Sequence, residues 1–288
     1  MLFTFLCIIR CAQACFLCLC RSPGRAVLQV DLIRLFCYFW LFITGKAIKM
    51  ALIKNVLALT TGLLACNALA AENYIPSLYN FSVMYDFNPV RGHVKTLTTA
   101  VRSETENFSI TLTLSPQGCI EQFERSGDGA YGNIALKRQG NNLTGTFDNS
   151  PLSYVIDNQC NLVSMTDKYG VKTFKLNNAG LIEQTMANSE KFSVYRYIAG
   201  DSFAGSEYYL NDKVATYSDV TYSDIHNKPL DFKMKTVFGQ EYTVYGESTC
   251  LYDDRKVPRE CTAITKKVRD DKVAQENHYS SKTAVTWY

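Results

Sequence analysis

The sequence predicts an all-β protein: a single antiparallel meander domain built from successive hairpins, as a curved sheet or partly closed barrel, preceded by a signal peptide. Three observations predict this fold. Short stretches rich in β-branched and aromatic residues alternate in polarity with period two. Turn residues separate these stretches at nearly constant intervals. No window of twelve or more residues has the 3.6-residue apolar spacing of an amphipathic helix.

The expected strands lie in the part of the chain that follows Cys66, which also holds seventeen of the eighteen tyrosines. Tyr, Val, Ile, Phe and Thr favour a pleated, half-buried surface, and alternation places one set of side chains on each face. The clearest of these strands span residues 110–114, 171–176, 192–197, 232–238 and 242–245.

Polar turns separate the strands in a regular series. Gly118, Gly140, Cys160, Gly180 and Gly200 are separated by 22, 20, 20 and 20 residues. Two strands and their two turns fill such an interval, so the spacing indicates a degenerate hairpin repeat. We expect one domain from about residue 71 to 288, because roughly 215 residues is a normal size for one all-β domain.

Residues 1–49 do not have the composition of a folded domain. They hold six of the eleven cysteines, and charged residues interrupt every apolar run before it reaches the ~18–20 residues that span a bilayer. Cys15 and Cys18 form a C-x-x-C pair, but no second pair stands at zinc spacing. We interpret residues 1–49 as upstream sequence translated from a start codon placed too early. In the alternative, Met1 is the true start and residues 1–65 form a longer membrane anchor.

Met50 begins a segment with the features of an export signal. Lys54 supplies a positive charge, and residues 56–65 form a ten-residue apolar core that is too short for a stop-transfer helix. Residues 50–65 are therefore the predicted signal peptide, of the lipoprotein type, and residues 66–288 the exported β domain. From Cys66 onward, 26 acidic residues outnumber 23 basic ones. That balance argues against nucleic acid as a partner.

Two cleavage sites compete at the end of this segment. Residues 63–66, Leu-Leu-Ala-Cys, resemble a lipobox, in which the thiol of Cys66 receives a diacylglycerol and becomes the first residue. Ala68-Leu69-Ala70 is an ordinary signal peptidase site, and cleavage after Ala70 would release a soluble periplasmic protein. With lipidation, Asn67 rather than Asp after the cysteine predicts the outer membrane more than the inner one. Several acyl chains on Cys66 would form a stable membrane anchor.

Four cysteines remain in the exported part, an even number in an oxidising compartment. Three disulfide connectivities are possible. A Cys250–Cys261 bridge would staple one hairpin, and Cys119 and Cys160 would then join strands two repeats apart. Disulfides are favoured over a metal site, because this part has no C-x-x-C and no histidine within a few residues of a cysteine. No cofactor and no metal are expected.

Residues 87–93 form the densest polar cluster. Arg91 and His93 are weak candidates for an anion site on a Pro/Gly turn, since Arg binds carboxylates and phosphates in a bidentate manner. The favoured alternative is a turn between strands in which Arg91 reaches a carbonyl or a neighbouring acid. No catalytic residues are predicted. The segment 200–205 has a serine between glycines without G-x-S-x-G spacing, and neither His226 nor His278 has an identifiable partner that would orient it.

Four segments of the exported part are similar to a known family: Tyr85–Lys95, Leu114–Ile120, Cys250–Cys261 and Trp287-Tyr288. On these segments, the chain from Cys66 to Tyr288 resembles the YnfC family of enterobacterial lipoproteins. The resemblance implies four cysteines in the same order and a lipobox at Cys66, and it brings no activity with it. It does not extend over residues 1–49.

We therefore expect a cell-envelope lipoprotein of a Gram-negative bacterium with a non-enzymatic structural or interaction role. It would contact the membrane through Cys66, and its envelope partner is unknown. One alternative is a soluble periplasmic binding module with an aromatic cleft, and a weaker one is an envelope hydrolase. A pocket that collects His93 or His226 with two carboxylates would favour the hydrolase. Tyrosines exposed on the surface would favour a binding module. We favour the alternative, in which the tyrosines occupy strand positions and pack across the sheet.

Overall fold

The computed structural model describes residues 73–128, 132–198 and 201–288. The chain divides into two units, Met1–Ala71 and Glu72–Tyr288, and the described residues belong to the second. The expectations for residues 1–49, for the signal peptide 50–65, for Cys66 and for cleavage after Ala70 lie outside the described residues.

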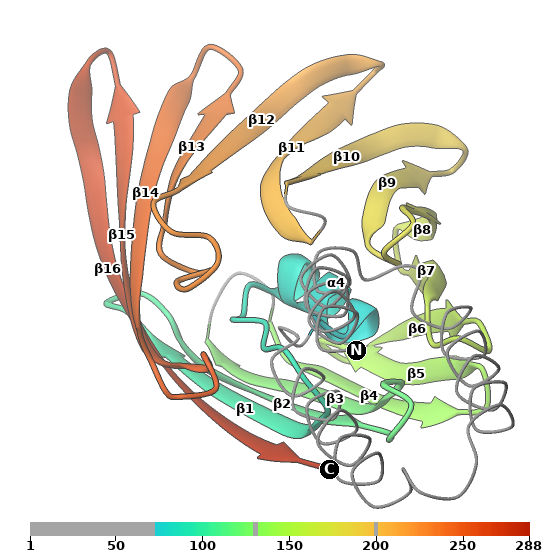
Figure 1. Cartoon of the computed structure of the whole chain (residues 1–288). Coiled ribbons are helices and arrows are strands. Elements are labelled where there is room, and N and C mark those ends of the chain that lie inside the picture. Colours follow the sequence, from blue (N-terminus) through green and yellow to red (C-terminus); the bar gives the residue numbers. More distant parts are fainter. Residues whose placement is uncertain (1–72, 129–131, 199–200) are drawn as a thin grey trace, which may run out of the picture. The chain divides into compact units, whose positions relative to one another are not determined.

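The described residues form one short helix and sixteen antiparallel strands in a closed barrel (Figure 1). Each strand pairs with the next one along the chain, and the first strand pairs with the last. The all-β meander is therefore confirmed, and the ring closes completely. The elements are α4 (Pro76–Tyr85), β1 (Val94–Arg102), β2 (Asn107–Leu114), β3 (Ile120–Asp128), β4 (Ile134–Gln139), β5 (Asn142–Phe147), β6 (Ser150–Ile156), β7 (Leu162–Asp167), β8 (Gly170–Leu176), β9 (Ile182–Ala187), β10 (Glu190–Ile198), β11 (Ser202–Leu210), β12 (Lys213–Tyr222), β13 (Phe232–Phe238), β14 (Tyr242–Tyr252), β15 (Pro258–Arg269) and β16 (Lys272–Trp287).

The described turns with the 20-residue spacing, at Gly118, Gly140, Cys160 and Gly180, lie at one end of the barrel, which we call the helix end. Two turns of this series and the β14–β15 turn at the same end share one geometry: the side chains of Asp157, Asn177 and Asp253 each accept the backbone N–H groups two and four residues later. Gly180 follows three residues after Asn177 with φ +76°, a conformation that favours glycine. Cys160 takes the same position with φ +68°.

The opposite end, which we call the hairpin end, is built mostly from tight two-residue turns. Asn and Asp populate the left-handed conformation that such turns require of both residues. Here the pairs Asp148-Asn149, Asn211-Asp212 and Asp270-Asp271 all have positive φ. A period of about twenty residues therefore corresponds to one strand toward the hairpin end, a turn there, one strand back and a second turn at the helix end.

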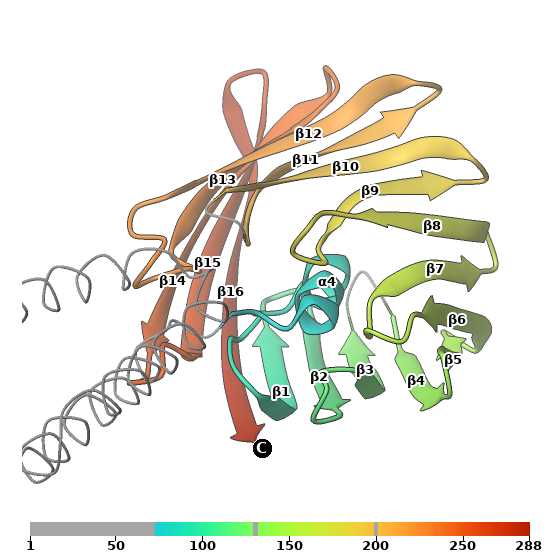
Figure 2. The same cartoon turned by 45° about the vertical axis from the view of Figure 1, so that its right-hand side comes forward.

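Helix α4 lies inside the ring of strands (Figures 1 and 2). It begins with Pro76, whose fixed φ suits the first helical position, and it ends at Asp86 in the left-handed conformation. Leu78 and Phe81 are fully buried, and the polar Asn80 is 1% exposed. Because the helix is enclosed on all sides, it has no solvent-facing polar stripe, and the periodicity test does not detect it.

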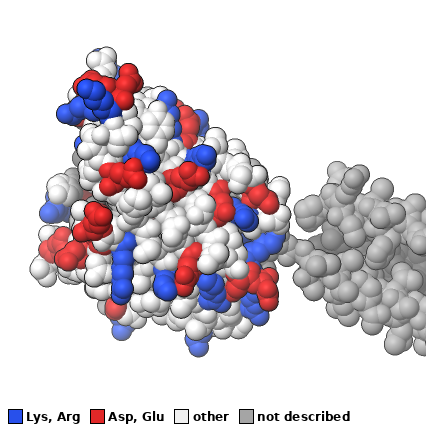
Figure 3. Space-filling model, turned by 90° about the vertical axis from the view of Figure 1, so that its left-hand side faces the viewer, with Lys and Arg blue, Asp and Glu red and all other residues white. Residues whose placement is uncertain are grey.

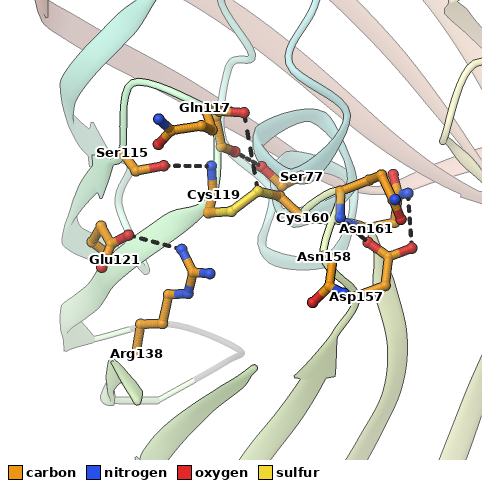
Figure 4. The surroundings of a disulfide bond; sticks show 12 residues. Ser77, Ser115, Gln117, Cys119, Glu121, Arg138, Asp157, Asn158, Cys160 and Asn161 are labelled. Atoms are coloured by element: carbon orange, nitrogen blue, oxygen red, sulfur yellow. Dashed lines mark hydrogen bonds and ion pairs between the residues drawn. A yellow bond between two sulfur atoms is a disulfide. The ribbon is translucent and has the colours of Figure 1, made fainter. Parts of the chain in front are cut away.

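Polar side chains fasten the start of α4 to the helix end, where a disulfide joins two of the turns (Figure 4). Ser77 Oγ donates to the carbonyl of Gly118 at 2.6 Å, and Asn80 Nδ2 donates to that of Gly180 at 2.9 Å. Asn80 Oδ1 also accepts the N–H of Ile182 at 2.9 Å. Cys119 and Cys160 join two of the turns at this end. The helix therefore starts at the helix end and runs toward the hairpin end.

The apolar core surrounds α4. Fully buried residues of the inner faces, such as Ile110, Phe123 and Leu143, pack with Phe81 in one cluster contributed mainly by β1–β9. The inner face of β11–β16 is different. Small hydroxyl side chains are buried there, and Ser218 and Thr236 hydrogen-bond to each other at 2.9 Å.

The outer face of the barrel that is drawn in Figure 3 carries charged residues of both signs, interspersed with other residues. Several form cross-strand ion pairs, including Lys282–Glu260 at 2.9 Å and Lys266–Glu276 at 3.1 Å. Exposed pairs of this kind contribute little to stability, up to about 1 kcal/mol each. In the part of the chain that the structure describes, no helix has the length and apolar character needed to cross a membrane.

Candidate ligand-binding cavity

A cavity of about 250 Å³ lies inside the barrel, between the last turn of α4 and the inner faces of strands from β4 to β11. Val83, Met84 and Tyr85 line it from the helix. Its other lining residues include Asp167 at the end of β7 and Phe192 near the start of β10, both next to tight turns. The cavity therefore lies toward the hairpin end, because α4 fills the helix end.

Period-two alternation places the lining residues on the inner face. Tyr154 stands two residues after Leu152 on β6, and Asp167 two residues after Met165 on β7. On β8, Lys172 begins the inward series. Because Met165 pairs with Lys172, Asp167 and Lys172 are diagonal neighbours on either side of the β7–β8 turn.

Asp167 and Lys172 form the one charged pair of the described lining. The Nζ of Lys172 lies 3.6 Å from Oδ2 of Asp167. The Asp167 side chain is 9% exposed and that of Lys172 26%. Asp167 Oδ1 accepts the backbone N–H of Tyr169 at 2.7 Å, which fixes the carboxylate on its strand. The pair thus combines a held carboxylate with a more accessible ammonium.

Aromatic rings form a wall beside this ion pair. The ring of Phe192 meets that of Tyr208 edge-on, with centroids 6.0 Å apart, and Tyr195 lies 6.3 Å from Tyr208. The Nζ of Lys172 is 5.3 Å from the centroid of Phe192. Phe174 adds a further ring to the same wall. These rings present both apolar surface and electron-rich faces to the cavity.

Two buried phenols complete the lining at α4. The hydroxyls of Tyr85 and Tyr154 hydrogen-bond to each other. Burial raises the pKa of Tyr85 to about 12, and the negative charge of Asp167 adds to the increase. Burial also raises the pKa of Tyr154 well above its ordinary value. Both phenols are therefore neutral at physiological pH, and they can donate or accept a hydrogen bond.

The structure does not bring Arg91 and His93 into this cavity. Arg91 forms an isolated β-bridge with Tyr74, its guanidinium lies 4.6 Å from the centroid of the Tyr74 ring, and its Nη2 lies 3.3 Å from Oδ2 of Asp201. The side chain of His93 is exposed. This arrangement matches the alternative in which Arg91 reaches a neighbouring acid. An anion at Arg91 would compete with Asp201.

The other candidate groups for chemistry are dispersed. Ser202 is buried at the start of β11, and its hydroxyl donates to Asp201 at 3.2 Å. His226 is exposed in the loop before β13, and His278 lies on the outside of β16, 3.2 Å from Glu276. Among the described residues, no group of three or more His, Cys, Asp and Glu side chains is positioned to hold a metal ion.

The four cysteines of the domain are joined in two disulfides. Cys250 and Cys261 are direct cross-strand partners on β14 and β15, so their bridge staples that hairpin. Cys119 and Cys160 connect the β2–β3 and β6–β7 turns. Of the three possible connectivities, this is the one in which Cys250–Cys261 closes a hairpin.

Sequence reasoning missed Asp167 and Lys172. Both flank a turn, where charged residues normally face water. The one signal in the sequence was the alternation along β7. Every second residue from Leu162 misses Asp167, whereas every second residue from the buried Met165 includes it and predicts that it faces inward. An irregular register between β6 and β7 accompanies this change of phase. The inward direction of the pair follows from the structure rather than from a motif.

The fold and cavity define the class: a closed antiparallel barrel that encloses a helix and an apolar internal cavity. The chain belongs to the uncharacterised protein family UPF0257, whose sequence model matches residues 49–288. The expected resemblance is thereby confirmed.

Two relatives named UPF0257 lipoprotein YnfC, from Escherichia coli O45:K1 (strain S88 / ExPEC) and E. coli strain K12 / DH10B, are each 25% identical over 221 residues. The match covers 75% of this chain and 90% of each relative. A crystal structure of a porin-like protein from Bacteroides uniformis aligns with a TM-score of 0.38 at 10% identity, over 67% of this chain and 98% of that one.

Proposed function

We propose that this protein is a non-enzymatic, lipid-anchored protein of the Gram-negative cell envelope whose barrel binds a small molecule in its internal cavity. The observation that carries the proposal is the cavity itself. It has apolar walls from residues such as Leu152 and Met165, aromatic rings on one side and a single ion pair. Small-molecule sites typically combine mostly apolar linings with a few polar groups that orient the ligand.

The anchor is proposed at Cys66. The lipobox-like segment 63–66 and the lipoprotein names of the E. coli relatives support it. The face of the barrel in Figure 3 carries charged residues of both signs, which is consistent with contact with water on that face, because lipid-facing barrel surfaces carry an apolar band. Asn67 favours the outer membrane. Cleavage after Ala70 would instead give a soluble periplasmic form with the same cavity.

Binding is favoured over hydrolysis by the composition of the lining. Its described residues include one carboxylate, Asp167, and no histidine. A hydrolase of the kind considered from the sequence would need a base with an orienting partner, or two carboxylates that share one pocket.

The binding proposal is tested with a neutral probe and a blocked cavity. Thr185 is 4% exposed and lines the cavity, so Thr185→Phe adds a ring inside it. The matched control is Thr173→Phe, at an exposed position on the outer face of β8. In ligand-observed NMR, 2-phenylethanol should bind the wild type and the control, and binding should be lost in Thr185→Phe. Absence of binding to all three proteins, or equal binding to all three, would contradict the proposal.

A further inference from the structure

We infer that the ligand of the cavity is a small organic cation: an amine or substituted ammonium with an apolar or aromatic body, whose positive charge lies beside Asp167. This inference rests on the proposed binding function and names its ligand class. Three independent features of the lining favour positive charge, and one side chain opposes it.

The first feature is the carboxylate of Asp167. It is almost fully buried and is fixed by the N–H of Tyr169, so it cannot turn to solvent without losing that bond. The Nζ of Lys172 lies 3.6 Å from Oδ2, farther than the usual distance of a charge-assisted hydrogen bond. A carboxylate in a poorly hydrated site is stabilised by a close cation. Asp167 is therefore a fixed acceptor with room for a closer donor.

Lys172 is the group that a ligand cation can replace. Its side chain is nearly three times as exposed as that of Asp167, at 26% against 9%, and its ammonium stands on a flexible four-carbon chain. When an ammonium binds at Asp167, the lysine can extend into water and keep its charge hydrated. The charge of the site is then balanced by the ligand, and Asp167 gains a closer partner.

The second feature is the aromatic wall. Phe192, Tyr195 and Tyr208 form it together with Phe174, and ring faces attract cations. Lys172 already lies within the range of such an interaction, 5.3 Å from the centroid of Phe192. The ammonium of a ligand can occupy the same region, while Leu152 and Met165 accept its apolar body.

The third feature is the end of α4. The helix starts at the helix end of the barrel, and its last residues, Val83, Met84 and Tyr85, line the cavity. The final carbonyl groups of a helix carry the negative end of its dipole. A carboxylate ligand would face this dipole, Asp167 and the ring faces together, and Lys172 is the one positively charged side chain of the described lining that would attract it. The balance of charges therefore selects a cation.

The volume of the cavity limits the size of the ligand. An apolar cavity of ~150 Å³ accommodates benzene. The cavity here is about 250 Å³, which suits one ring or a branched aliphatic group with a short charged chain. The compound 2-phenylethylamine has this size, and it has a neutral analogue, 2-phenylethanol, and an acidic one, phenylacetate.

The test measures the affinity of the three analogues by calorimetry with the full chain, as processed in a Gram-negative host and purified. We expect the amine to bind about tenfold more tightly than the alcohol, a difference of ~1.4 kcal/mol, and the acid to bind most weakly. Asp167→Asn should abolish the preference for the amine. Asp219→Asn is the matched control, because Asp219 is an exposed carboxylate on the outside of β12 that pairs with Arg196.

Lys172→Gln provides a second variant that leaves Asp167 intact. Removing the competing ammonium should increase the affinity for the amine severalfold and leave that for the alcohol unchanged. Tighter binding of the acid, or an amine preference that persists in Asp167→Asn, would overturn the ligand class. In both of these outcomes the alcohol still binds, so the ligand class fails and the proposed binding function stands. If none of the analogues binds, both the ligand class and the binding function fail.

Discussion

The two sides of the barrel interior are filled in different ways. Around α4, strands β1–β9 contribute large apolar residues such as Phe123 and Leu112, which pack against Phe81 of the helix. The inner face of β11–β16 contributes small hydroxyl residues, including Ser218, Thr236 and Ser248. The strands of both sides alternate and pair alike. Alternation therefore encodes the sheet, and the size of the inward residues differs between the two sides. The cavity lies among the large side chains of β4–β11, where the last turn of α4 leaves space.

The largest effect is expected on the packed side. Phe81 is fully buried, and the centroid of its ring lies 5.1 Å from the ring centroids of both Phe123 and Tyr154. Phe81→Ala should reduce the free energy of unfolding by about 3–5 kcal/mol, since it removes apolar burial and leaves a cavity. The control on the other side is Phe232→Ala. Phe232 is half-buried, so this variant should lose less free energy of unfolding. Urea denaturation with the disulfides intact measures both. Equal losses would contradict the proposed asymmetry.

The two disulfides should differ in the stability that they contribute. The Cys119–Cys160 bridge closes a segment of 41 residues and the Cys250–Cys261 bridge one of 11. Loop-closure entropy predicts losses of about 4 and about 3 kcal/mol for the respective double serine variants. Paired replacement avoids leaving a single free thiol. Chemical denaturation of the oxidised proteins compares them. Unchanged melting of the Cys119→Ser, Cys160→Ser protein would argue against a bridge at the helix end.

Alkaline pH should destabilise the packed side through its tyrosines. Burial raises the pKa of Tyr85 to about 12, whereas an unfolded tyrosine titrates near 10. The folded state therefore holds its proton more tightly, so this contribution is complete below pH 10 and is lost as the pH rises through 12. Two pKa units correspond to about 3 kcal/mol. Tyr85→Phe should reduce the dependence of the free energy of unfolding on pH between 10 and 12. Chemical denaturation at several pH values measures this dependence. The exposed Tyr245→Phe should leave it unchanged.

The smallest effect is expected among the hydroxyls of the other side. Ser218→Ala removes one partner of the buried bond to Thr236 and should cost about 1–2 kcal/mol, because the Thr236 hydroxyl loses its partner. Adding Thr236→Val should recover most of that loss, since both polar groups are then absent. Thermal unfolding of the two variants measures the difference. Additive losses would show that the hydroxyls act separately.

The strands and turns could be predicted from the sequence because their signals are local. Alternation identified the segments that became β2, β8, β10, β13 and β14, and Asp157 and Asn177 stand at the starts of predicted turns. Closure of the ring could not be predicted, because it depends on pairing between β1 and β16, nearly two hundred residues apart. Helix α4 was missed because burial on all sides removes its periodicity.

The cavity was missed for a related reason. No motif marks it, and its lining comes from one helix and from strands spread between residues 134 and 208. Asp167 and Lys172 have the composition of an ordinary hairpin flank. Their inward direction depends on the register at β6–β7, and their joint role depends on α4 leaving space beside them. Arg91 and His93 were more conspicuous in the sequence, yet Arg91 has Asp201 as its partner.

The central claim is that a lipid-anchored barrel binds a small molecule beside α4. Native mass spectrometry of the processed protein, isolated under mild conditions from the envelope of a Gram-negative host, tests it most directly. We predict a polypeptide that begins at an acylated Cys66, with no thiol that can be alkylated after denaturation. We also predict a small bound species that is absent from Thr185→Phe and present in Thr173→Phe. A chain that retains residues 1–49, or one without a bound species in either variant, would contradict the account.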